Sequence, residues 1–318
     1  MRAIRLTAAA TAILVYALIV LGAVVRTTNS GLSCPDWPTC YGHWLPLPGD
    51  IAALPSVGYS YGQVMLEWVH RLIAGVFVGP LVLVVALLAF RYRHDAPRIA
   101  LSGGLLVLLL LVQGALGGLT VLDQNSPWSV AIHLGNALLV LTMTLRIAIL
   151  ASPPAPTASA RFLCRSAVVA WVLALLAMMS AAMAAKSGAS LACTTWPLCE
   201  GALVPDLGDE LVRLHFLHRV LAAVTACAVM VLFWRSRTSP GLSHGLARLV
   251  ALATVLVLVQ VALGAMVILL EAPVWNAVLH QAVGVLTFAV VTVILWRCAA
   301  AGGASTVGER DGLALRGA

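Results

Sequence analysis

Charged residues are scarce in this chain. Asp, Glu, Lys and Arg make up 10% of its 318 residues, whereas 61% are hydrophobic, and the mean hydropathy is +1.00. An ordinary soluble domain carries about 25% charged residues. This shortage excludes the soluble class and places the chain among integral membrane proteins.

Two motifs are also missing. The sequence contains no Cys-x-x-Cys-His, which argues against covalently attached c-type haem. The first apolar run, 6–25, is not followed by a small-x-small cleavage site, and it is longer than the apolar core of a signal peptide. We therefore predict that this run is kept as the first membrane helix and is not a cleaved signal peptide.

Long apolar runs are plentiful. A membrane-spanning helix needs about 20 mostly apolar residues, and irregular backbone cannot face lipid, so such runs predict helices. The predicted spans are roughly 6–25, 64–90, 99–122, 128–150, 163–185, 211–234, 246–270 and 274–298.

Basic residues gather on one side of these spans. The formal charge of +7 follows the positive-inside pattern, which sets topology, so we expect no nucleic-acid partner. Fourteen of the nineteen Lys and Arg residues lie on the predicted inner side: Arg2, Arg5, Arg91, Arg93, Arg98, Arg146, Arg161, Arg165, Arg235, Arg237, Arg248, Arg297, Arg310 and Arg316. The sequence predicts a multi-pass protein of the plasma (inner) membrane, surrounded by lipid, with both termini cytoplasmic.

Four of the seven cysteines fall in the predicted external loops, on an oxidising side where disulfides persist. Cys34 and Cys40 have the same spacing as Cys193 and Cys199. Two local disulfides are the first interpretation, and a metal site built by all four cysteines is the second. Cys164, Cys227 and Cys298 are interpreted as small apolar residues.

The chain also contains an internal repeat. Leu111–Gly117 matches Leu258–Gly264, and the first cysteine loop is echoed by the second. Four spans per copy give both copies the same orientation, so the fold class is all-α, with two four-helix bundles in a parallel repeat. The predicted divisions are an N-terminal half (1–150), a cytoplasmic linker (151–160), a C-terminal half (161–299) and a disordered tail (300–318).

Each predicted half contributes two intramembrane histidines, His70 and His133 in the first, His218 and His280 in the second. All four lie about 8–11 Å below the outer interface, from the rise per helical residue. A lone histidine in a membrane helix often only hydrogen-bonds a neighbour, but four at matched depth favour cofactor ligation. Zinc or copper needs a third close ligand, so haem is preferred.

The repeat breaks beside these histidines. Glu67 precedes His70 by three residues and shares its helix face, whereas the second copy has His215 there. A desolvated glutamate can donate or accept a proton, which predicts a reactive site in one half. The alternative is a salt bridge from Glu67 to Arg71 or Arg26. Three arginines could meet haem propionates: Arg26, Arg71 and Arg219.

These residues resemble the haem A synthase family over essentially the whole chain. The resemblance is carried by Gly22–Cys40, Glu67–Arg71, His133, His215–Arg219 and His280–Gln281. It implies eight helices in two similar halves, and oxidation of the methyl group at ring position 8 of haem O to a formyl group by successive hydroxylations.

The resemblance also implies roles for single residues. His70 and His133 would hold haem O as substrate, His218 and His280 would hold an electron-passing haem b, and Glu67 would be catalytic. Both cysteine pairs match pairs that members carry. The implied partners are haem O synthase, a membrane electron donor and further copies in a homo-oligomer. Two other hypotheses remain open here: a di-haem electron-transfer subunit without chemistry of its own, and a haem or small-molecule transporter.

Overall fold

The computed structural model describes residues 1–52, 58–152, 161–239 and 241–314. Over these ranges the chain is helical and forms no strand, only two isolated β-bridges in loops. Eight helices there are long and apolar enough to cross a membrane, which confirms the predicted number and class.

The spans follow one another along the chain with short α2 (Pro48–Ala52) and the 3₁₀ turn η2 (Ala189–Leu191) in the loops between them. The second span is built from three consecutive pieces. The spans are α1 (Arg2–Thr27), α3–η1–α4 (Tyr61–Leu72, Ile73–Val78 and Gly79–Phe90), α5 (Pro97–Leu122), α6 (Pro127–Leu150), α7 (Arg161–Lys186), α8 (Glu210–Thr238), α9 (His244–Leu269) and α10 (Val274–Ala314).

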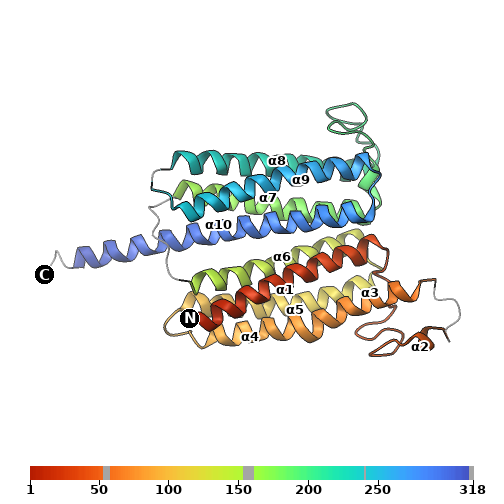
Figure 1. Ribbon diagram of the computed structural model, residues 1–318, viewed down its shortest axis with the longest axis horizontal. Coiled ribbons are helices and arrows are strands. Elements are labelled where there is room, and N and C mark those ends of the chain that lie inside the picture. Colours follow the sequence, from red (N-terminus) through yellow and green to blue (C-terminus); the bar gives the residue numbers. More distant parts are fainter. Residues whose placement is uncertain (53–57, 153–160, 240, 315–318) are drawn as a thin grey trace.

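The helices lie side by side in two groups. Figure 1 shows α1, α3, α4, α5 and α6 in one group and α7 to α10 in the other, with α10 running beside α1 and α6. One buried apolar core includes residues from both groups, among them Leu138 of α6 and Phe288 of α10. The division into a parallel repeat remains a prediction, but the two groups are packed into one body.

The long loops that follow α1 and α7 lie at one end of the bundle. The start of α1 and the end of α10 lie at the other end, away from α2 and both cysteine-containing loops (Figure 1). Side chains fix where helices begin at that loop end: Ser60 and Gln63 form a capping box at α3, and the Asp209 carboxylate accepts from the first turn of α8. These caps set the position of the residues one and two turns further in.

A π-helical segment interrupts the second span, where the sequence predicts one continuous helix. In η1 the N–H of Gly79 reaches the carbonyl of Ala74, five residues back. Pro80 has no N–H to continue the ordinary α-helical pattern, which explains the wider turn. Such segments are frequent at functional sites, and this one begins three residues after His70.

The structure bears on one of the two predicted boundaries near the linker and the tail. Helix α10 continues to Ala314, past the apolar span that ends at Ala300, whereas the sequence predicts a disordered tail from residue 300. The alanines around 299–301 are strong helix formers, which favours this continuation. Most of the predicted linker, 153–160, and the last four residues, 315–318, lie outside the described residues.

Candidate functional site

The structure brings the four intramembrane histidines together in two pairs. His70 on α3 and His133 on α6 lie close enough for their charges to interact. The same holds for His218 on α8 and His280 on α10. All four rings are only partly exposed. Each group of helices therefore has its own interior site, which contains two imidazoles.

Glycines on neighbouring helices leave room for three of these rings. A Cβ added at Gly22 of α1 would lie 3.3 Å from Nε2 of His70. Equivalent atoms at Gly117 and Gly264 would lie 3.5 and 3.1 Å from His133 and His280. A larger residue at position 22 or 264 would therefore press on the ring, whereas at Gly117 the added Cβ would make ordinary van der Waals contact.

Amide side chains hold one histidine of each pair, a feature that the sequence prediction missed. Nε2 of Gln113 lies 3.2 Å from Nε2 of His133, and the Asn136 amide donates to Oε1 of Gln113 at 2.7 Å. Likewise, Nε2 of Gln260 lies 3.4 Å from Nε2 of His280. Both glutamines belong to the repeated Leu-Val-Gln motif, so a polar residue in matched apolar runs was the available signal.

The other two histidines, His218 and His70, differ in whether a hydrogen bond orients the ring. Oγ of Ser180 lies 3.2 Å from Nδ1 of His218. No hydrogen bond from the described residues holds the ring of His70, which lies against Gly22 instead. Hydrogen bonds to the remote nitrogen fix the orientation of a ligating imidazole, so Ser180 can orient the ring of His218 in a way that no described residue does for His70.

The site around the second histidine pair also contains buried polar atoms that lack a hydrogen-bond partner among the described residues. Nδ1 of His280, Oε1 of Gln260 and Oδ1 of Asn276 are buried and have no hydrogen-bond partner among the described residues. A buried polar group without a partner is costly, so these atoms are typical of a site that takes a ligand. No group of three or more His, Cys, Asp or Glu in that part of the chain could hold a metal ion. Two imidazoles in an apolar bundle therefore fit a haem, whose own ring supplies the remaining ligands.

The Glu67 carboxylate is buried one turn above His70, with 4% of the residue exposed. Its Oε1 forms a 2.5 Å ion pair with Arg71, i to i+4. Its Oε2 accepts hydrogen bonds from the backbone N–H of Cys34 at 2.9 Å and from the Ser33 hydroxyl at 3.1 Å. The predicted salt bridge to Arg71 is present, and the carboxylate also anchors the first cysteine loop.

His215 occupies the same place in the second group. The backbone N of Cys193 lies 3.1 Å from its Nδ1 and Nε of Arg219 lies 3.2 Å from its Nε2, and the neutral ring accepts at whichever of the two nitrogens carries no proton. His215 is buried, with 5% exposed. An imidazole thus makes the loop contact and the arginine contact that Glu67 makes in the first group.

Arg71 and Arg219 clamp the two loops. Each guanidinium donates to three loop carbonyls: those of Cys34, Asp36 and Thr39 for Arg71, and those of Cys193, Thr195 and Leu198 for Arg219. Planar guanidinium groups suit such convergent acceptors. Their predicted contact with propionates remains a prediction, and the structure places most of their donors on the loop.

Arg26 joins the two groups of helices. Its Nη2 donates to Oε1 of Gln281 on α10 at 2.7 Å. It is also close enough to His280 and to Lys186 for their charges to interact. Two cationic side chains therefore gather beside the second histidine pair near the loop end. A propionate contact by Arg26 remains a prediction.

Both predicted disulfides are present. Cys34 is bonded to Cys40 and Cys193 to Cys199, so the alternative of a four-cysteine metal site does not apply. In the first loop, burial alone would raise the pKa of Asp36. Hydrogen bonds from Thr39 and from the N–H groups of Gly42 and Tyr41 have the larger effect, so the pKa of Asp36 lies below its usual value. This lowered pKa stabilises the loop above the ordinary pKa of aspartate, and the stabilisation is lost as the pH falls through the shifted one.

The disulfides give a prediction for thiol chemistry. In non-reduced protein, a maleimide reagent is expected to leave Cys34 and Cys40 unmodified, as read by peptide mass spectrometry. Cys34→Ser is the matched control, because it frees Cys40 and should make that residue reactive. Strong labelling of both cysteines in the wild type would contradict the bond.

Comparison with known proteins agrees with the site. The model of the cytochrome oxidase assembly protein family matches residues 5–292. Haem A synthase of Shouchella clausii is 31% identical over 265 residues, covering 80% of this chain and 83% of its own. Haem A synthase of Shewanella oneidensis is 30% identical, covering 89% and 94%, and that of Rhodospirillum centenum is 32% identical, covering 84% and 81%. Over almost its whole length, the chain belongs to the cytochrome oxidase assembly protein family that includes these haem A synthases.

Proposed function

We propose that this protein is a haem A synthase, a membrane enzyme that oxidises the methyl group at ring position 8 of haem O to a formyl group by successive hydroxylations. The observation that carries this proposal is the pair of histidine sites in a chain of this family. Two sites suit a reaction in which one haem is the substrate and the other delivers electrons.

We assign haem O to His70 and His133, and haem b to His218 and His280. When bound, haem b supplies single electrons. The support for this order is the contrast between two histidines: Oγ of Ser180 lies 3.2 Å from Nδ1 of His218, whereas no hydrogen bond from the described residues orients the ring of His70. A substrate must enter and leave, while a resident cofactor gains from fixed ligands.

Glu67 is the residue that we assign to proton transfer. Anchoring the loop does not require a carboxylate, because His215 does it in the second group. The carboxylate is therefore available for a task that only the first site has. Each hydroxylation with O2 takes up two electrons and two protons (R–CH3 + O2 + 2 e⁻ + 2 H⁺ → R–CH2OH + H2O), and the Glu67 carboxyl can pass protons to the site. The Ser33 hydroxyl, 3.1 Å from Oε2 of Glu67, offers a path by which the carboxyl is reprotonated.

The surroundings of the enzyme follow from its topology. We propose that both termini are cytoplasmic and that the disulfide loops lie outside the plasma membrane, because the basic residues gather at the end opposite to those loops. Haem O synthase would supply the substrate, a membrane electron donor would reduce haem b, and a homo-oligomer is the expected assembly.

The direct test uses the wild-type protein, purified from cells supplied with haem O. Extraction of the bound haems is expected to yield haem A or its hydroxylated intermediate alongside haem b. Haem b and unchanged haem O alone would overturn the proposal and favour the di-haem electron-transfer subunit. Movement of haem across vesicles without oxidation would favour a transporter.

A further inference from the structure

One face of α5 is left open beside the first histidine pair. Helices α4 and α6 pack on α5, whereas α3 and η1, the outer part of the second span, pack on α1. A Cβ added at Gly114 would have no described atom of another segment within 4 Å. Gly117, three residues further along α5, lies against the ring of His133. The open face therefore adjoins the place where α5 contacts the first site.

The first disulfide loop covers the outer end of this open face. A Cβ added at Gly118 would lie 3.5 Å from two ring atoms of Trp37, Cδ2 and Cε3. Gly118 follows Gly114 by one turn, about 6 Å nearer to the loop end at 1.5 Å per residue. The Asn125 amide, in the turn after α5, donates to the carbonyl of Gly31 and holds the loop in place. Trp37 thus forms a roof over the open face, with 51% of the residue still exposed.

The second copy of the repeat has larger or non-polar residues at these positions. Gly264 is retained against His280, just as Gly117 is against His133. In contrast, Gly114 corresponds to Val261, Gly118 to Ala265 and Asn125 to Ala272. A valine side chain occupies the room that Gly114 leaves, and an alanine has no amide to hold a loop. The open face is therefore a property of the first site and not of the repeat.

We propose that this open face, from Trp37 down to Gly114, takes the isoprenoid side chain of haem O. The proposal rests on the proposed function, in which His70 and His133 hold the iron of the same haem. Haem O differs from haem b in this long apolar chain, which needs room beside the porphyrin and an apolar surface to cover it. The large indole of Trp37 supplies such a surface. Val261 narrows the equivalent place in the second group, which therefore suits a haem without the chain.

The experiment measures competition between two haems for the purified full chain, without a reductant. Haem O and haem b are offered in equal amounts, and the haem O retained per chain is measured by extraction and chromatography. The wild type is expected to retain haem O in preference to haem b at the first site. Gly114→Val copies the second group and should lower this preference by about tenfold or more, because even one methylene of room in an apolar pocket counts about 10–200-fold. Haem b should still bind.

A second variant tests the roof without adding bulk to a helix. Trp37→Ala is expected to lower the preference for haem O in the same direction, and Trp37→Phe should restore much of it because an aromatic surface returns. Trp196→Ala, in the second disulfide loop, is the matched control and should leave the preference unchanged.

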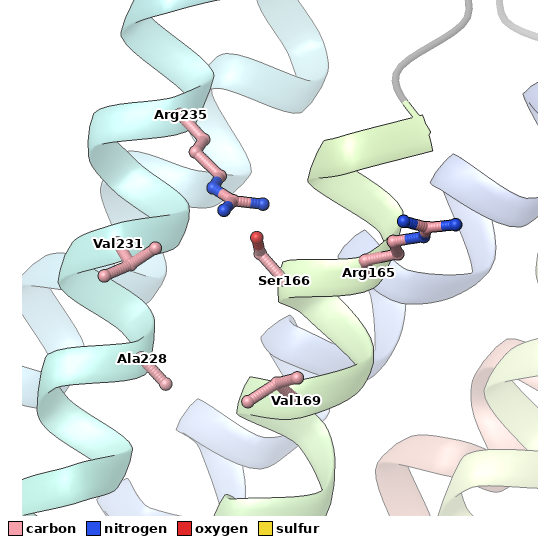
Figure 2. Close-up of a pocket in the computed structure, with 6 residues that line it drawn as sticks. All are labelled: Arg165, Ser166, Val169, Ala228, Val231 and Arg235. Carbon is pink, nitrogen blue, oxygen red and sulfur yellow. The ribbon is translucent and has the colours of Figure 1, made fainter.

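A further control places a valine in a different apolar groove. Ala228 lines the groove between α7 and α8 that Figure 2 shows, and it follows His218 by ten residues, about 15 Å along the helix. Ala228→Val should leave the retention of both haems unchanged.

The outcomes separate this inference from the proposed function. If the wild type prefers haem O and both Gly114→Val and Trp37→Ala keep that preference, the open face does not hold the isoprenoid chain. Equal loss of haem O and haem b from the first site of Gly114→Val would mean that the valine blocks the porphyrin itself, and this would also overturn the inference. A wild type that retains only haem b would overturn the proposed function and the inference with it.

Discussion

Replacing Glu67 with histidine is expected to reduce the conversion of haem O by at least about 100-fold while the protein stays folded with both haems bound. General acid–base catalysis contributes about 10²–10⁴-fold, which sets this magnitude. The fold should survive because histidine makes the equivalent contacts at position 215, to the N–H of Cys193 and to Arg219. The measurement is the ratio of haem A and its hydroxylated intermediate to haem O in extracts of the purified variant.

Two companion variants separate chemistry from anchoring. His215→Glu makes the reciprocal change in the second group, and conversion should fall far less because no proton transfer is assigned there. Glu67→Gln keeps the size of the side chain and can still accept from Cys34, yet it is expected to be as inactive as Glu67→His. If Glu67→His converts haem O at the wild-type level, Glu67 serves only to hold the loop.

Removing one histidine from each pair is expected to abolish the binding of one haem and spare the other. His218→Ala should eliminate haem b, because the ring that Ser180 orients is lost. His70→Ala should abolish retention and conversion of haem O while haem b remains. The separation is expected because the pairs are built on different helices, α3 with α6 and α8 with α10. Absorption spectra and extracted haem composition provide the readout.

The pattern of losses decides the assignment. Loss of haem b from His70→Ala, with haem O kept, would show that the sites are assigned in reverse order. Loss of both haems from either variant would mean that the pairs are interdependent, contrary to the assignment. Ser180→Ala is the mild control, since it keeps the His218 ring and removes only its partner. It should weaken retention of haem b without eliminating it.

The membrane spans could be predicted from the sequence because hydropathy alone decides which segments enter the bilayer. The predicted run 64–90 corresponds to the span Tyr61–Phe90, and its earlier start is set by the polar cap at Ser60. The π segment at Ile73–Val78 was not predicted. Its cause, a proline without an N–H, is visible in the sequence, but proline in a membrane helix can be accommodated in several ways.

The site was predictable only as far as the repeat could indicate it. The repeat singled out the histidines and the contrast between Glu67 and His215, both of which depend on position along the chain. The partners of Arg71 and Arg219 depend on how the cysteine loops fold back over the helices, and no pattern in the chain encodes those carbonyls. Gln113 was visible in a repeated motif, but its contact with His133 depends on how α5 packs against α6.

The contact between the two groups of helices bears on how the two sites came to differ. Helices α1 and α6 meet α10, and α6 also meets α7. These are the first and last spans of each predicted half, joined by bonds such as the one from Tyr16 to Ala282. Two copies of a four-helix ancestor would associate through the same faces, and in such a homodimer every residue occurs in both sites. A single chain that carries both predicted halves can instead have Glu67 in one of them and His215 in the other.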